Sequence, residues 1–325
     1  MDKIIIFGDS SSFITNILLK NLLEIIRTCK DIELVAVVDT ASSPPDPKIL
    51  RVIKVILFEL RKKIFNPQEK IYLTEWRFNN LYDLCRKFSV KVLVPPLRDV
   101  NSTEFTSYLK KELKPTIGFV MGCPQVIHKD LREAFEIMVN YHNSSLPQYR
   151  GVYATAWSIY FNDSFTGFSF HRISDKLDAG NILLGESFAL SEKRTLLDWE
   201  IIKTFKASDY LSALIELAQQ RALGTAQQGA SSYFGQKEYN LMTQIDHPQE
   251  LTFAEISKKL KAFSSLRINI HGRYYEVTDF SSKKNKLLND HLSFITKDNI
   301  HIQVTRVCYL PWNFYKMYEW VKRKR

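Results

Sequence analysis

The sequence VNYHNSSLPQYRG, at residues 139–151, places an amide and an imidazole at the end of an apolar run and continues into a polar loop. The run at residues 135–139 predicts a buried β-strand that extends to His142. Asn140 and His142 lie two residues apart, so on a strand both side chains point to the same face. Proline and glycine mark the loop that follows, and α/β folds build their sites in such loops. A hydrogen-bond donor and a titratable base are therefore expected side by side.

The chain before this stretch predicts an α/β domain. Residues 3–8 form an isoleucine-rich strand, and a second strand spans residues 33–39. Between them, the serines at 10–12 can cap a helix over residues 13–30. This strand–helix–strand opening implies a parallel sheet with a right-handed crossover. A further helix is expected at residues 79–88, and further strands at residues 91–95, 116–121 and 135–142.

The chain changes character in its second half. A helical pattern runs over residues 196–222, and residues 224–230 have the glutamine- and glycine-rich composition of a linker. Extended segments are expected at residues 181–188, 267–278, 292–296 and 300–307. We therefore predict a catalytic domain at residues 1–222, a linker at 223–245 and a small β-rich, barrel-like domain at 246–325.

The composition of the 325 residues, 45% hydrophobic and 25% charged, is that of an ordinary soluble globular protein. The chain opens directly on a strand pattern without the features of a signal peptide, and no apolar run reaches the roughly 20 residues of a membrane span. The four cysteines are scattered without a Cys-x-x-Cys pair, so neither a zinc site nor a disulfide framework is indicated. A reducing cytoplasm and no metal are expected. The cysteines are Cys29, Cys85, Cys123 and Cys308.

The net charge of +10 favours an anionic partner. Part of it is local, in Lys283, Lys284, Lys286 and the basic tail at residues 322–325. A solvated loop and a frayed basic tail are the favoured explanation of these clusters, and nucleotide phosphates, tRNA and an acidic membrane surface are the alternatives. The aromatic residues at 312–320 are expected to pack on the C-terminal domain.

Several common enzyme motifs are missing from the sequence. Residues 8–12 contain one glycine and do not form the Gly-x-Gly-x-x-Gly fingerprint of a dinucleotide-binding dehydrogenase. Neither a Walker A sequence nor a Gly-x-Ser-x-Gly elbow is present. A Ser-His-Asp triad made of Ser144, His142 and Asp178 is possible by residue type, but it lacks that elbow.

Two more stretches follow the opening one: TGFSFH at residues 166–171 and DAGNI at residues 178–182. In this order they resemble the formyltransferases that use 10-formyltetrahydrofolate, whose fingerprint is Asn-x-His-x-Ser-Leu-Leu-Pro-x-Tyr/Trp-Arg-Gly, then Thr-Gly-x-Thr-x-His, then Asp-x-Gly-x-Ile. Ser145, where the family usually has Leu, and residues 154–156, which lack a common Pro, depart from it and bear on substrate selection. The resemblance implies a Rossmann-like formyltransferase domain with a parallel-rich sheet and a small C-terminal barrel.

The three motifs point to Asn140, His142 and Asp178 as catalytic residues. His142 has an ordinary pKa near 6.5 and can take a proton from an amine and return it to the leaving folate nitrogen. Asn140 can donate to the oxyanion of the tetrahedral intermediate, a contact worth roughly 3 to 4 kcal/mol. A carboxylate beside His142 would favour the imidazolium. Asp178 matches the family's Asp-x-Gly, whereas its rival Asp175 does not.

The resemblance also implies which residues bind the substrates. The backbone expected to meet the folate belongs to Met121, Gly122, Cys123 and Pro124. The residues expected to bind the acceptor are Ser144, Tyr149 and Arg150, and Arg150 could hold a phosphate or carboxylate or pin its own loop. His171 is expected to be structural, near the site.

The implied activity is transfer of a formyl group from 10-formyltetrahydrofolate, as co-substrate, to the amine of a nucleotide-linked amino sugar. The residues around Arg150 resemble the sugar enzymes more than the tRNA enzyme. Methionyl-tRNA formyltransferase is the first alternative, and formylation of a hydroxyornithine is another. A degenerate folate- or sugar-binding protein is the non-enzymatic alternative, and a homodimer is compatible with all four.

Overall fold

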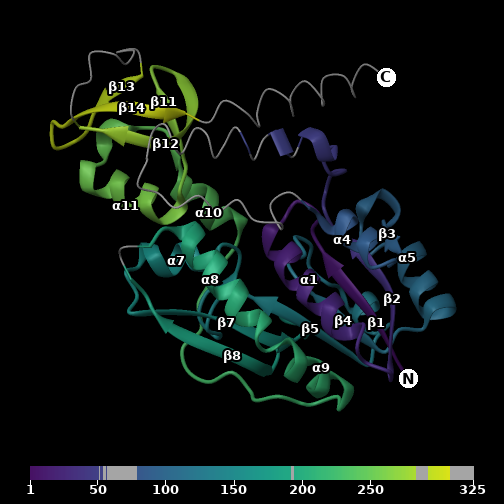
Figure 1. Cartoon of the computed structure of the whole chain (residues 1–325). Coiled ribbons are helices and arrows are strands. Elements are labelled where there is room, and N and C mark those ends of the chain that lie inside the picture. The colour runs from purple at the N-terminus through teal and green to yellow at the C-terminus, as the bar shows by residue number, and fades with distance from the viewer. Residues whose placement is uncertain (51, 54–55, 57–78, 192–193, 283–291, 308–325) are drawn as a thin grey trace. The chain divides into compact units, whose positions relative to one another are not determined.

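In the computed structural model the chain divides into two compact units (Figure 1). The structure describes residues 1–50, 52–53, 56, 79–191, 194–282 and 292–307. The first unit comprises Met1–Arg150, Gly167–Phe188 and Glu200–Ser232, and the second comprises Gly151–Thr166, Ala189–Trp199 and Tyr233–Arg325. The domain boundaries predicted at residues 222 and 246 stay predictions. Lys283, Lys284, Lys286, Cys308 and the tail at residues 312–325 lie outside the described residues.

A seven-stranded sheet with the order β3-β2-β1-β4-β5-β7-β8 organises the first unit. Its strands are β1 (Asp2–Gly8), β2 (Ile32–Asp39), β3 (Val92–Leu93), β4 (Ile117–Val120), β5 (Ile137–His142), β7 (Phe165–Arg172) and β8 (Ile182–Ala189). The pairs from β3 through β5 are parallel, and β7 then pairs antiparallel with β5. The α/β class with a parallel-rich sheet is thereby confirmed. Strands buried on both faces explain why β1 reads as a continuous apolar run.

The first helix, α1 (Phe13–Ile26), crosses over between β1 and β2. Ser12 caps it, because its hydroxyl accepts a hydrogen bond from the amide of Thr15. The helix was predicted to reach residue 30 but ends at Ile26. Beyond that residue, the amide and hydroxyl of Thr28 both bond to the carbonyl of Ile25, so a tight turn replaces the helical ladder.

The predicted helix over residues 196–222 is two helices, α8 (Leu196–Ser208) and α9 (Leu211–Gln219). The apolar periodicity continues through the break and does not reveal it. A tertiary contact lies at the break: Tyr210 donates its hydroxyl proton to Glu186 on β8 at 3.0 Å. The first unit also holds α4 (Leu81–Lys87), η1 (Pro96–Arg98), α5 (Thr103–Tyr108), η2 (Leu109–Leu113) and α6 (Lys129–Arg132).

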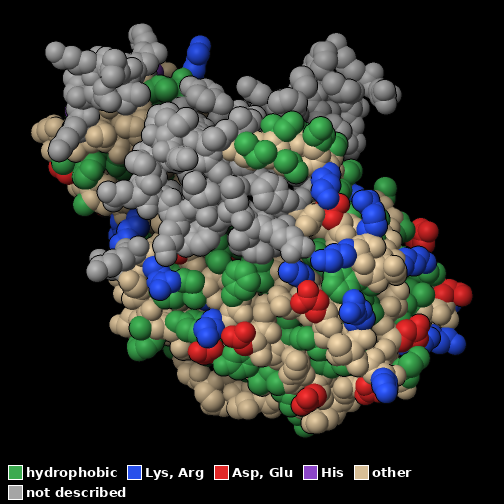
Figure 2. Space-filling view, in the orientation of Figure 1, with side chains coloured by type: hydrophobic (Ala, Val, Ile, Leu, Met, Phe, Trp, Pro, Cys, Tyr) green, Lys and Arg blue, Asp and Glu red, His purple; other side chains and the backbone are tan. Residues whose placement is uncertain are grey.

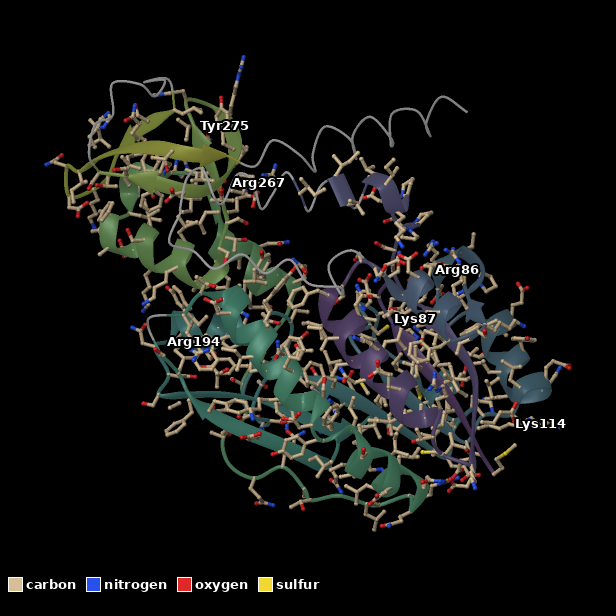
Figure 3. The ribbon with its side chains drawn as sticks, viewed as in Figure 1. Arg86, Lys87, Lys114, Arg194, Arg267 and Tyr275 are labelled. Carbon is tan, nitrogen blue, oxygen red and sulfur yellow. The ribbon has the colours of Figure 1, made fainter. Side chains whose placement is uncertain are left out.

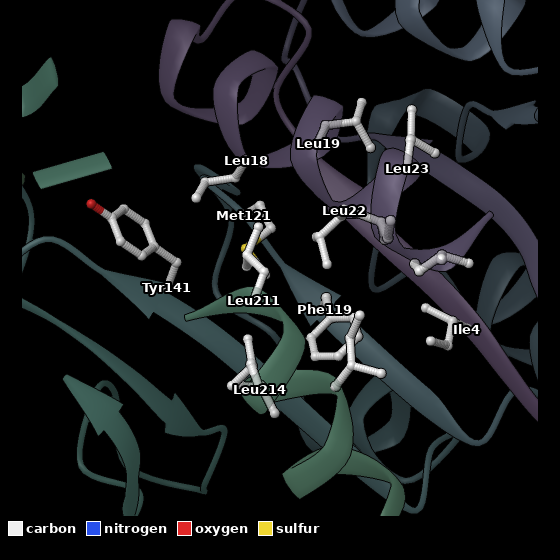
Figure 4. Close-up of a cluster of buried hydrophobic side chains, with 14 of the residues drawn as sticks. Ile4, Leu18, Leu19, Leu22, Leu23, Phe119, Met121, Tyr141, Leu211 and Leu214 are labelled. Atoms are coloured by element: carbon white, nitrogen blue, oxygen red, sulfur yellow. The ribbon is translucent and has the colours of Figure 1, made fainter. Parts of the chain in front are cut away.

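Two clusters of buried apolar side chains cover the faces of this sheet. The larger joins the leucines of α1 and α9 to Phe119 on β4 and Tyr141 on β5 (Figure 4). The smaller surrounds Phe7 and Phe135, whose rings meet edge to face at 5.8 Å. Packing on both faces therefore fixes β4 and β5, the strands that lead to the motif residues.

The second unit contains a five-stranded sheet with the order β10-β11-β12-β14-β13. Its strands are β10 (Gln244–Ile245), β11 (Leu266–Ile270), β12 (Arg273–Ser281), β13 (Ser293–Ile295) and β14 (His301–Val307). The β-rich character predicted for the C-terminal part is confirmed. The remaining elements are β6 (Arg150–Gly151), which forms a two-stranded sheet with β9 (Tyr233–Phe234), and α7 (Ala154–Tyr160), α10 (Gln236–Thr243), η3 (Pro248–Glu250) and α11 (Phe253–Phe263).

One prediction for this part was wrong in detail, and one helix was not predicted. The single strand expected at residues 267–278 is a hairpin, because His271 and Gly272 both take positive φ, at 50° and 80°, and turn the chain. The helix α11 was not predicted. Its sequence signal is a capping box in which Thr252 and Glu255 satisfy each other's backbone amides.

Charged side chains are dispersed over the face shown in Figure 2, where basic and acidic groups are interspersed. Figure 3 labels Arg86 and Lys87 at the end of α4 and Lys114 after η2. Arg86 lies 3.8 Å from Asp83, one turn away on the same helix. The Arg86 side chain is 80% exposed, and a pair with such an exposed partner contributes little stability. The buried core is therefore expected to supply most of the stability of the first unit.

We expect Phe119→Ala to lower the free energy of unfolding of the first unit by about 3 to 5 kcal/mol, because a fully buried ring is lost and a cavity remains. Urea denaturation would measure this change. Phe205→Ala is the matched control, since Phe205 is 45% exposed on α8. Equal losses in the two variants would contradict the assignment of Phe119 to the core.

Candidate functional site

The end of β5 carries the two motif residues on one face. Asn140 and His142 alternate with Tyr141, whose ring packs into the larger core cluster on the opposite face. The antiparallel register places His171 of β7 opposite Asn140, and Ser169 opposite His142. The predicted side-by-side placement of the amide and the imidazole follows from this geometry.

The hydrogen bonds of His142 fix its tautomer. Its Nε2 lies 2.8 Å from the carbonyl oxygen of Tyr149, and a carbonyl can only accept. The neutral ring therefore carries its proton on Nε2 and leaves a lone pair on Nδ1, which lies 3.6 Å from Oδ2 of Asp178. Burial lowers the pKa of His142 below its usual value of 6.5, and the Asp178 carboxylate partly opposes that shift. The ring is thus a neutral base at physiological pH.

His171 links Asn140 to Asp178. Its Nδ1 donates to the carbonyl of Arg172 at 2.9 Å, so Nε2 of the neutral ring can accept from Nδ2 of Asn140 at 3.1 Å. The same Nε2 lies 3.4 Å from Oδ1 of Asp178. One amide proton of Asn140 is therefore held by His171, and the second is left to donate elsewhere. His171, expected near the site, lies at its centre.

Asp178 occupies a tight turn after β7. Its φ of 50° is a left-handed conformation that aspartate tolerates better than most residues. Gly180 presses against β7, because a Cβ there would lie 1.8 Å from the carbonyl oxygen of Arg172. Asp175 is 78% exposed and pairs instead with Arg132 at 2.7 Å. Of the two aspartates, the structure brings Asp178 to the histidines.

The loop after β5 is held by its own polar groups. Ser144 is buried and donates its hydroxyl proton to the carbonyl of Gln148 at 2.6 Å. Ser169 joins the loop to β7 by donating to the carbonyl of Ser144 and accepting from the amide of Leu146. Within the described residues no hydrogen bond joins Ser144 to His142, which argues against a Ser-His-Asp triad.

A buried lysine supports the same loop from α8. Lys203 is fully buried and donates to the carbonyl of Asn143 at 2.8 Å. The side chain of Asn143 in turn contacts Glu200 and accepts from the hydroxyl of Tyr141 at 3.1 Å. Burial lowers the pKa of Lys203 to about 8, although Glu200 opposes the shift. No motif marks Lys203 in the sequence, because it lies within the apolar pattern of α8.

The four residues expected to meet the folate follow β4, the neighbour of β5. Val120 pairs with Asn140, so these four residues begin, at Met121, one residue beyond that pair. Its carbonyl accepts from the hydroxyl of Thr15 at 2.6 Å, while its side chain is buried in the core. Gly122 has a φ of 92°, and burial raises the pKa of the Cys123 thiol to about 11. The backbone of Met121–Pro124 therefore stays the predicted folate contact.

Arg150 meets a residue that sequence reasoning placed in the linker. Its Nη2 and Nε donate to Oε1 of Gln227 at 2.7 and 3.2 Å. Tyr149 has a φ of 58°, and its amide donates to the hydroxyl of Ser232 at 2.8 Å. Residues near the end of the first unit thus complete the motif loop.

Two absences concern the described residues alone. No group of three histidine, cysteine or carboxylate side chains among them is arranged to hold a metal ion. No helix in that part of the chain is both long and apolar enough to cross a membrane. The three cysteines that are described, Cys29, Cys85 and Cys123, are free thiols.

Residues 86–203, which contain β5, β7 and the Asp178 turn, match the family model described as formyl transferase. A formyl transferase domain is thus shown for residues 86–203. The resemblance seen in the three motifs is thereby confirmed. Lys203 and His171, which the motifs did not assign to catalysis, also lie within the matched region.

Three similarities extend this result. GDP-perosamine N-formyltransferase of Brucella melitensis is 37% identical over 99 residues, which are 30% of this chain and 38% of that protein. Methionyl-tRNA formyltransferase of Borreliella afzelii is 25% identical over 147 residues, 45% of either chain. The chain thus spans less than half the length of these curated relatives.

The third similarity is one of fold. The structure of an N-formyltransferase from Helicobacter canadensis, in complex with folinic acid and dTDP-3-aminofucose, superposes with a TM-score of 0.57. The match covers 95% of this chain and 100% of that one at 18% identity.

We expect NMR titration of ring nitrogens to show His142 with a pKa below 6.5 and with its proton on Nε2. Asp178→Asn should lower that pKa further, because it removes the negative charge that favours the imidazolium. Asp175→Asn is the matched control and should leave the pKa unchanged. An unchanged or raised pKa in Asp178→Asn would show that Asp178 does not act on His142.

Proposed function

We propose that the protein is an N-formyltransferase that moves a formyl group from 10-formyltetrahydrofolate to the primary amine of a nucleotide-linked amino sugar. The observation that carries the proposal is the cluster of Asn140, His142 and Asp178 within a formyltransferase domain. It combines a neutral base, an oriented amide donor and a buried carboxylate, which are the groups that formyl transfer to an amine requires.

In the proposed reaction, the acceptor amine attacks the formyl carbon and forms a tetrahedral intermediate. Nδ1 of His142 takes a proton from that nitrogen and then delivers it to N10 of the folate as the bond from N10 to the formyl carbon breaks. The amide proton of Asn140 that His171 does not hold donates to the intermediate's oxyanion. Asp178 stabilises the imidazolium while it exists.

Support for a sugar acceptor comes from the relatives. GDP-perosamine N-formyltransferase is among the relatives matched, and the Helicobacter canadensis structure holds dTDP-3-aminofucose together with folinic acid. A guanidinium beside the site, that of Arg150, suits the phosphates of a nucleotide. The scattered thiols favour a reducing cytoplasm, and a homodimer stays a prediction.

Methionyl-tRNA formyltransferase is the second candidate, because a relative of that name matches 45% of the chain. The two candidates differ in salt dependence. An RNA acceptor would be bound through many phosphates, so its binding should weaken steeply as salt rises, whereas a sugar nucleotide carries few.

Formyl transfer should therefore be measured with a panel of nucleotide-linked 3-amino and 4-amino sugars, charged initiator methionyl-tRNA and a hydroxyornithine. We expect a sugar nucleotide to be formylated with a kcat of about 1 s⁻¹ or more. Turnover of the tRNA alone would favour the second candidate. Folate binding without transfer to any acceptor would contradict the enzymatic proposal and favour a binding protein.

His142→Ala should lower kcat by about 10²- to 10⁴-fold through loss of the base. Asn140→Ala should lower it by about 10²- to 10³-fold through loss of the oxyanion donor. Folate affinity, measured by calorimetry, should change little in either variant. Near-normal turnover in His142→Ala would remove it as the base.

The two aspartates provide a matched pair for the third role. Asp178→Ala should be nearly as damaging as His142→Ala, because the imidazolium would lose its buried counter-charge. Asp175→Ala removes an exposed carboxylate and should retain activity. If Asp175→Ala lost more activity than Asp178→Ala in the same assay, Asp175 and not Asp178 would be the carboxylate that stabilises the imidazolium.

A further inference from the structure

The segment at residues 221–232 returns from α9 to the site and is hydrogen-bonded along its length. Nη1 of Arg172 donates to the carbonyl of Ala222 at 2.7 Å. Ile182 and Thr225 exchange two backbone hydrogen bonds of 2.8 Å. At the far end, the amide of Arg150 donates to the carbonyl of Ser232 at 2.9 Å. Hydrogen bonds therefore join this segment to β7, to β8 and to the motif loop at Arg150.

Gln227 is the residue of this segment that contacts both the Asp178 turn and Arg150. Its Nε2 donates to two carbonyl oxygens in the Asp178 turn, those of Asp178 and Gly180, at 2.8 Å each. Its Oε1 accepts hydrogen bonds from both Nη2 and Nε of Arg150. From Leu223 to Ala230 the other residues are exposed, and Gln227 is half-buried.

The four hydrogen bonds allow one orientation of the amide. The carbonyl oxygens of the turn can only accept, and the guanidinium of Arg150 can only donate. Glutamine supplies a double donor and an acceptor on one side chain, and it spans the distance between them. A carboxylate in its place could still accept from Arg150 but would face the two carbonyl oxygens without a proton.

These hydrogen bonds of Gln227 concern two parts of the site, the carboxylate of Asp178 and the guanidinium of Arg150. The turn that Gln227 holds carries the carboxylate 3.6 Å from Nδ1 of His142, and Asp178 sits there with a positive φ. Within the described residues Arg150 makes no other side-chain hydrogen bond, so the remaining N–H groups of its fork are left for an anionic ligand. One side chain therefore contacts both the turn that carries the carboxylate and the guanidinium of Arg150.

We propose that Gln227 is a positioning residue that couples the placement of Asp178 beside His142 to the orientation of Arg150 toward an anionic group of the acceptor. The catalytic part of this inference rests on the proposed formyl transfer. Loss of Gln227 should move the carboxylate away from His142, which lowers the pKa of the imidazole, and should free the guanidinium to rotate.

The test compares wild type with Gln227→Ala, Gln227→Glu and Gln228→Ala. Gln228→Ala is the matched control, because that neighbouring side chain is exposed and, in the part of the chain that the structure describes, bonds only to the carbonyl of Ala226. Gln227→Ala should lower kcat by about 10- to 100-fold, as expected for a misplaced catalytic group, and raise the acceptor KM. The acidic limb of its pH–kcat profile should move to lower pH. Gln227→Glu should not restore kcat, since it cannot donate to the turn.

The pKa of His142, measured by NMR without substrate, separates this inference from the proposed function. If wild type transfers no formyl group but the pKa of His142 falls in Gln227→Ala and not in Gln228→Ala, the function fails and the positioning role stands. If wild type is active and Gln227→Ala keeps both its kcat and its acidic limb, the inference is overturned. Should Gln227→Ala not fold, Gln227→Met keeps the bulk of the side chain and serves in the same comparison.

Discussion

The antiparallel pairing of β7 with β5 is the constraint on which the site depends. It sets His171 opposite Asn140 in register, and the chain leaving β7 then turns tightly enough to return Asp178 to both histidines. A shift of one residue in this register would turn His171 to the core face and separate it from Asn140. The core on both sides of the sheet resists that shift, so packing energy is linked directly to the geometry of the polar cluster.

The cluster places one carboxylate between two buried imidazoles. Main-chain carbonyls determine which ring nitrogen of each imidazole carries the proton. Tyr149 holds the proton of His142 on Nε2, and Arg172 holds that of His171 on Nδ1. Water is largely excluded, so the interaction of Asp178 with a developing imidazolium is stronger than it would be at the surface. Burial makes His142 a base that stays neutral, and the carboxylate limits the cost when it accepts a proton.

The sequence predicted what local patterns encode. Apolar runs located the strands, and the two-residue spacing placed Asn140 and His142 on one face. The choice of Asp178 over Asp175 came from the resemblance to the family's Asp-x-Gly element. Long-range contacts could not be read in this way. Lys203 reaches the loop from a helix whose periodicity looks like ordinary core, and Gln227 lies in a stretch whose composition indicates a linker. Both side chains donate to main-chain carbonyls, and a main-chain carbonyl leaves no mark on the sequence of the residue that binds it.

We infer that formyl transfer takes place at the cluster of Asn140, His142 and Asp178. The most direct test is a crystal structure of the protein with a stable 10-formyl analogue of the folate bound. We expect the pterin to lie against the backbone of residues 121–124 and the formyl oxygen to lie about 3 Å from Nδ2 of Asn140, on the side of His142. An analogue bound with its formyl group away from these side chains would show that transfer does not take place at this cluster.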